Sequence, residues 1–163
     1  MKPQKGAIGI VGVLLGMIIV AGLALASIAV AANLKAGEIA ITGAVNKTFT
    51  PIKKEAGKLM NSIVINLFEK TLGGVTLTFP ADTQLGTYPI EDHLHKPVVA
   101  FLAEYDVFGP AHAFYLSTQG TLVLTAVGVR FSGHFEFSAG HNKDDTKTIK
   151  VVGSFDEVPF KAN

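Results

Sequence analysis

The stretch FSGHFEF at residues 131–137 alternates phenylalanine with polar residues: Phe131, Phe135 and Phe137 are separated by Ser132, His134 and Glu136. Successive side chains of a β-strand point to opposite faces, so this period of two predicts a strand with one buried and one solvated face. The segment VTLTF at residues 75–79 has the same period. Both segments therefore predict a sheet with an aromatic and aliphatic buried face.

Similar segments follow one another through the C-terminal half of the chain. We expect further strands at 98–107, 113–116, 121–129 and 148–155, a hairpin turn at STQGT (117–121) and a solvated loop at SAGHNKDDTK (138–147). Because no helical pattern separates these strands, residues 75–163 are predicted to form an antiparallel β-sandwich or small barrel.

The preceding segment, residues 37–74, shows a different period. Thr50-Pro51 is typical of a helix start, and apolar residues then recur three and four positions apart up to Gly73-Gly74, namely Ile52, Ala56, Leu59, Met60, Ile63 and Leu67. This pattern predicts a short amphipathic helix, preceded by a connecting strand at EIAIT (38–42). Its apolar stripe is expected to pack on the sheet. The alternative is a membrane surface, with Lys53, Lys54 and Lys58 near lipid head groups.

The N-terminal segment from Gly6 to Leu34 contains no charged residue. Since about 20 apolar residues cross a bilayer as a helix, residues 7–36 are predicted to form a long apolar transmembrane helix. Lys2 and Lys5 precede the segment, which favours an N-terminus inside the cell and residues 35–163 outside. A secretory signal peptide cleaved after Ala31 is the competing interpretation, although its apolar region is normally shorter.

Small residues recur at a spacing of four within this helix. Gly12 and Gly16 form a GxxxG pair, and Gly22 and Ala26 repeat the spacing. Small side chains let helix backbones approach closely, so these four positions are predicted to pack against other helices. The predicted fold class is therefore α+β: a long apolar helix, a short amphipathic helix and a C-terminal β-domain.

The sequence KGAIGI at residues 5–10 resembles the start of archaellins and related archaeal type IV pilins. This resemblance implies a leader peptide at residues 1–6, cleaved between Gly6 and Ala7, and an apolar helix that is retained in the mature chain. It further implies a subunit held in the membrane before assembly and a homo-oligomeric filament with that helix in its core.

The sequence offers little chemistry for catalysis. There is no cysteine, and no phosphate-binding loop or nucleophile elbow occurs. His93 and His95 are weak metal-site candidates, because residues two apart on a strand share a face. Formal net charge is +1, which argues against a nucleic-acid partner. We expect no enzyme and no cofactor.

Asn46-Lys47-Thr48 is an N-glycosylation acceptor sequence, consistent with an extracellular β-domain. The leading hypothesis is thus a structural subunit of an archaeal flagellum- or pilus-like filament at the cell surface. The alternative is a single-pass membrane or virion-envelope protein whose β-domain binds a protein or surface ligand. A third hypothesis is a secreted β-protein that begins at Ala32.

Overall fold

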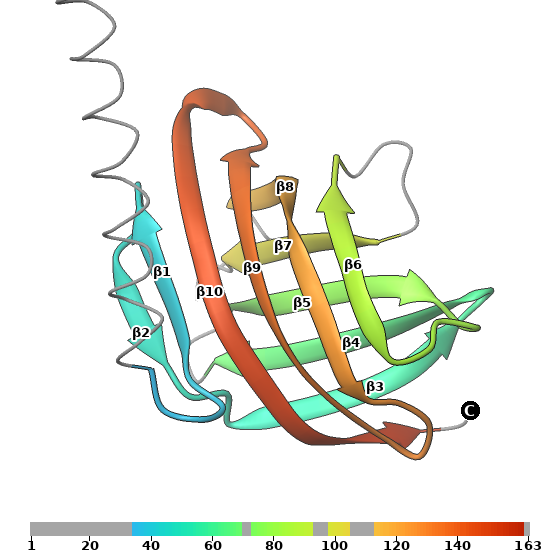
Figure 1. The fold of residues 1–163 in the computed structure, drawn as a ribbon. Coiled ribbons are helices and arrows are strands. Elements are labelled where there is room, and N and C mark those ends of the chain that lie inside the picture. The colour runs from blue at the N-terminus through green and yellow to red at the C-terminus, as the bar shows by residue number, and fades with distance from the viewer. Residues whose placement is uncertain (1–33, 70–72, 93–97, 105–112, 162–163) are drawn as a thin grey trace, which may run out of the picture. The chain divides into compact units, whose positions relative to one another are not determined.

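The computed structural model describes residues 34–69, 73–92, 98–104 and 113–161 (Figure 1). Contacts divide the chain into two units, Met1–Asn33 and Leu34–Asn163. The predicted leader, the cleavage site and the predicted helix-packing positions Gly12, Gly16, Gly22 and Ala26 lie outside the described residues, as does nearly all of the predicted apolar helix.

The described part of the second unit consists of ten strands in one sheet (Figure 1). Their bounds are β1 Ile39–Gly43, β2 Lys47–Phe49, β3 Lys53–Leu59, β4 Ser62–Glu69, β5 Gly73–Pro80, β6 Gly86–Glu91, β7 Val99–Glu104, β8 Ala113–Ala126, β9 Arg130–His141 and β10 Asp144–Lys161.

The sheet closes on itself. Antiparallel pairings lead from β3 through β4, β5, β7, β8 and β9 to β10, and β10 then pairs with β3 in parallel. That last pairing joins only Phe160 to Ala56 and Lys161 to Gly57, and we call it the seam. β1 pairs with the first half of β10 and carries β2, while β6 pairs with the second half of β8.

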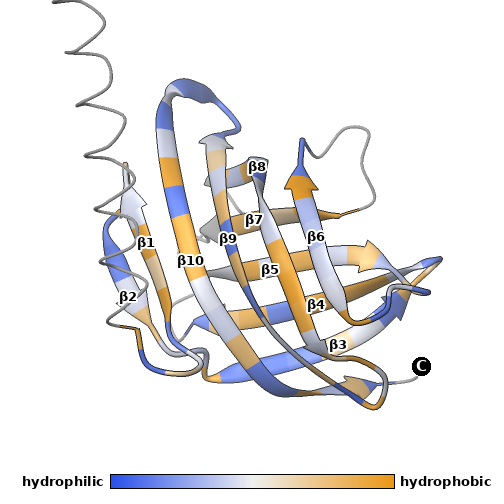
Figure 2. Ribbon diagram, viewed as in Figure 1, coloured by the Kyte–Doolittle hydropathy of each residue, from blue (hydrophilic) through white to orange (hydrophobic). Residues whose placement is uncertain are grey.

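Alternate residues along these strands are buried, and Figure 2 shows hydrophobic positions interspersed with hydrophilic ones along the ribbon. Phe79, Phe135, Phe137 and Phe155 are almost fully buried, and the rings of Phe135 and Phe155 stack with centroids 6.3 Å apart. Fully burying such a side chain contributes roughly 1.5–3 kcal/mol. A Cβ at Gly153 would lie 2.9 Å from both Ile39 Cγ1 and Phe135 Cζ, so only glycine fits beneath β1.

The predicted amphipathic helix is wrong. Residues 53–59 and 62–69 form the hairpin β3–β4, and three residues of the predicted apolar stripe, Ile52, Leu59 and Met60, are 69%, 62% and 87% exposed. The inward positions of β4 are instead Ile63, Ile65 and Leu67, at a spacing of two. The β-branched run at 63–65 favours a strand, and Asn61 supplies the turn.

The predicted α+β fold class is therefore corrected, since the described part of the chain is all-β. Among those residues, none forms a helix with the length and hydropathy needed to span a bilayer. The predicted hairpin turn at 117–121 lies inside β8, where the register shifts between Ser117 and Gln119. The predicted loop at 138–147 is largely strand, because β9 runs to His141 and β10 starts at Asp144.

Candidate functional site

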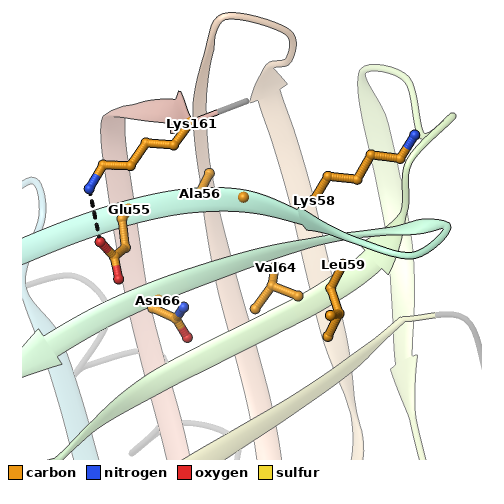
Figure 3. A pocket seen from close by; sticks show the side chains of 8 residues that line it. Glu55, Ala56, Lys58, Leu59, Val64, Asn66 and Lys161 are labelled. Carbon is orange, nitrogen blue, oxygen red and sulfur yellow. Dashed lines mark hydrogen bonds and ion pairs between the residues drawn. The ribbon is translucent and has the colours of Figure 1, made fainter. Parts of the chain in front are cut away.

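A pocket of about 280 Å³ lies where the outer faces of β3 and β4 meet the end of β10 (Figure 3). It is lined by Glu55, Ala56, Gly57, Lys58, Leu59, Val64, Asn66 and Lys161. Because polar groups stand at its margin, we take this pocket as the candidate site.

The local sequence explains why the surface is hollow at this point. In β3, Ala56 points inward and is buried, so its neighbours Glu55 and Gly57 belong to the outer face. Gly57 has no side chain, and a Cβ there would meet nothing closer than the Lys161 carbonyl oxygen at 4.0 Å. Its partner across the hairpin is Val64. The missing side chain at Gly57 thus leaves the floor of the pocket open, with an apolar wall on β4.

The charged margin of the pocket centres on one carboxylate. Glu55 Oε2 lies 3.1 Å from Lys53 Nζ and 3.1 Å from Lys161 Nζ, and Figure 3 shows Lys161 and Glu55 pointing toward each other across the seam. The hydrogen bond from Lys53, followed by that from Lys161, lowers the pKa of Glu55 below its ordinary value of 4.5. The carboxylate is therefore ionised at neutral pH and links two strands that pair over only two residues.

A neutral pair holds the opposite wall. The Thr76 hydroxyl of β5 donates a 2.8 Å hydrogen bond to Asn66 Oδ1 of β4. This bond fixes the carboxamide, so the Asn66 amide nitrogen is directed away from Thr76. The pocket therefore presents a positively charged edge, one amide and an apolar wall.

The ionisable groups that line the pocket are one carboxylate, Glu55, and two lysines, Lys58 and Lys161. Glu55 is already engaged by two lysines, and no serine, histidine or second carboxylate lines the pocket. Within the described ranges, no group of three His, Asp or Glu side chains could hold a metal ion.

The residues predicted from sequence are distributed elsewhere. Asn46 is exposed in the turn between β1 and β2, where its side chain accepts a hydrogen bond from the Gly43 N–H and donates one to the Gly43 carbonyl. Its position leaves it open to solvent, as glycosylation requires. His93 and His95 lie outside the described residues, and so do Gly6 and Ala7.

The pocket was not predicted from the sequence, because the spacing of apolar residues at 52–67 predicts a helix at this position. The signal was nevertheless present: Glu55 lies between Lys53 and Gly57 at a spacing of two, which places all three on one face of a strand. The contribution of Lys161 had no local signal, since it depends on the pairing of β10 with β3.

Comparison with known proteins gives no relative for this chain. No family, curated protein or solved structure matches it.

Proposed function

We propose that this protein is a structural subunit of an extracellular filament, assembled through its N-terminal apolar segment and displaying the closed β-domain on the outside. The proposal rests on the short connection between the N-terminal apolar segment and the β-domain. The uncharged segment ends at Leu34, and Ile39, only a few residues later, is already fully buried in β1. The chain thus joins a segment suited to lipid or helix packing directly to a self-contained domain.

Two further features support the proposal. The small residues Gly12, Gly16, Gly22 and Ala26 suit close packing between copies, and KGAIGI at 5–10 resembles an archaellin or pilin leader junction. The exposed Asn46 suits a domain on the cell surface.

The strand β1 favours a second candidate function. Because Ile39–Gly43 is a strand, a continuous helix cannot extend past residue 38, which shortens any filament core formed by this segment. A single-pass anchor that presents the β-domain to a protein or surface ligand needs no longer helix. In this second candidate the N-terminal segment spans the membrane and does not polymerise.

N-terminal sequencing of native material separates the candidates. A mature chain that starts at Ala7 supports the filament subunit, Met1 supports the anchor, and Ala32 supports a secreted protein. Electron microscopy of the same material should show filaments if the first proposal is correct. Particles that stay single would overturn it.

A variant pair tests the packing role directly. We expect Gly12→Leu to abolish filament formation, because the added side chain separates the helix backbones. Val13→Leu enlarges a neighbouring position outside the GxxxG pair and should assemble normally. Equal assembly of both variants would contradict a role for the small residues.

A further inference from the structure

One end of the β-domain carries most of its exposed large apolar side chains. Of the five such side chains among the described residues, four are Met60, Val129, Leu59 and Leu85, with exposures of 87%, 84%, 62% and 60%. The fifth, Ile52, lies at the opposite end of β3. We call the four residues the apolar tip.

Strand register and hydrogen bonds show that these residues share one end. The Ala81 N–H, on the β5–β6 loop that carries Leu85, donates to the Asn61 carbonyl of the β3–β4 turn. The Phe160 N–H, at the end of β10, donates to the Val129 carbonyl of the β8–β9 turn. Phe160 pairs in turn with Ala56 of β3. Figure 1 shows these turns and the C-terminal end of β10 at the same end of the sheet.

The backbone at Met60 makes its side chain an unusual choice. Leu59 pairs with Ser62, so Met60 and Asn61 form a two-residue loop, and Met60 has a φ of 54°. A positive φ at the first loop position favours glycine and costs an L-residue energy. An almost fully exposed methionine in a strained backbone position does not stabilise the fold. We therefore expect the Met60 side chain to contact something outside the domain.

Basic residues flank the apolar tip. Lys58 precedes Leu59, Arg130 follows Val129, and Lys161 lies at the seam. Figure 3 shows Lys58 extended away from Glu55, leaving its ammonium group available. Arg130 is ion-paired with Glu157 at 3.0 Å and Lys161 with Glu55 at 3.1 Å, while Asp82 lies on the β5–β6 loop. Of the three basic residues, Lys58 is therefore the one whose charge is not offset by an ion pair within the described part of the chain.

We propose that the apolar tip inserts into the surface of an anionic lipid bilayer while the chain is membrane-anchored. This inference rests on the membrane stage of the proposed function. Single apolar side chains on separate, convex turns suit a fluid interface, into which each sinks independently, whereas a protein partner requires a continuous complementary surface. Lys58 then lies at the level of the lipid phosphates, beside the Arg130–Glu157 ion pair.

Tryptophan fluorescence tests the proposal, because the chain contains no tryptophan. The full chain is reconstituted as Met60→Trp or Asp145→Trp into vesicles of phosphatidylglycerol and phosphatidylcholine with brominated or ordinary acyl chains. Asp145 is exposed near the β9–β10 turn, at the other end of the domain. Interfacial side chains lie roughly 5–10 Å deep, so bromine should remove about half of the emission at position 60 and almost none at position 145.

Each outcome has a distinct meaning. A chain that floats with the vesicles but is not quenched at position 60 overturns the tip proposal alone. A chain that does not float overturns both the tip and the membrane stage. Quenching at 60 in a chain that never forms filaments supports the tip and overturns the filament proposal. A lipid-free blue shift at 60 that grows with protein concentration assigns the tip to contact between copies and overturns lipid insertion.

Discussion

At the scale of single residues, Glu55 makes the fold sensitive to acid. Its pKa is lowered in the folded chain, first by the hydrogen bond from Lys53 and then by that from Lys161. A lowered folded-state pKa means that the stabilisation is complete above the ordinary value of 4.5 and is lost as the pH falls through the folded value. The carboxylate is partly exposed, so its ion pairs contribute at most about 1 kcal/mol.

We predict that Glu55→Gln lowers the thermal midpoint slightly at pH 7. The difference from the natural chain should shrink as the pH falls below 4.5 and disappear once the pH is below the lowered pKa of Glu55 in the folded chain. Thermal unfolding of the full chain in detergent, followed by circular dichroism across this range, measures the difference. Asp145→Asn, at the other end of the domain, serves as the matched control. A difference that persists unchanged in strong acid would show that Glu55 acts through packing and not through its charge.

Among the structural elements, the β3–β4 turn is expected to lower the stability of the fold, because Met60 occupies a strained backbone position. An L-residue at a positive φ costs the folded chain about 1–2 kcal/mol, and Met60→Gly removes this cost. Glycine in turn increases the conformational entropy of the unfolded chain, which destabilises the fold by about 0.5–1 kcal/mol. We therefore predict a net gain of up to about 1 kcal/mol in the free energy of unfolding, measured by denaturant titration. Asn61→Gly is the control, because the φ of Asn61 is not positive and no strain is relieved. Equal gains in both variants would contradict strain at Met60.

The same hairpin shows how far sequence could predict the elements. Period-two segments such as 75–79 and 131–137 are strands, because their alternation has no competing helical interpretation. Residues 52–67 fit both periods: Ala56, Ile63 and Leu67 are buried in the hairpin and also fit a helical stripe. The deciding signal was the β-branched run at 63–65, which favours a strand over a helix.

The lengths of β8 and β10 could not be predicted in the same way. β10 extends to Lys161 because register shifts between Asp144 and Thr148 and between Phe155 and Val158 let the strand bend and keep pairing. Glu157, within the second shift, has a φ of 53°. Its N–H donates to Ser132 Oγ on β9, so a contact between strands holds this conformation. This register shift depends on contacts with the neighbouring strand, so no local sequence pattern predicts it.

At the scale of the whole domain, closure depends on long-range pairing that sequence does not show. Three strands pair along β10: β9 on one side, and β1 followed by β3 on the other. The candidate pocket lies at the seam, because Lys161 reaches β3 only when the sheet closes. Val129 of the apolar tip is joined to the seam through its hydrogen bond with Phe160. Sequence could therefore predict much of the sheet, but neither the β3–β4 hairpin that carries the site nor the site itself.

The seam should also be the place where the closed sheet opens first. Two backbone positions pair there, and the Glu55–Lys161 ion pair and a 2.9 Å hydrogen bond from Lys54 Nζ to the Asp156 carbonyl also join β3 to β10. The ring of Phe160 packs edge-on against Phe131 with centroids 6.0 Å apart. Phe160 is only partly buried, so we predict that Phe160→Ala costs roughly 1–3 kcal/mol, less than a fully buried phenylalanine. Amide exchange at Ala56 and Gly57 should accelerate, while exchange in β9 stays slow.

Lys161→Ala provides the matched comparison at the adjacent position. Its side chain is 63% exposed, so losing the ion pair should cost less than about 1 kcal/mol and leave exchange at Ala56 nearly unchanged. Hydrogen exchange with mass spectrometry on the full chain resolves the two variants peptide by peptide. If Phe160→Ala instead accelerates exchange equally in every strand, the sheet opens only as a whole. Closure at the seam would then be inseparable from global folding, because the remaining pairings could not persist without it.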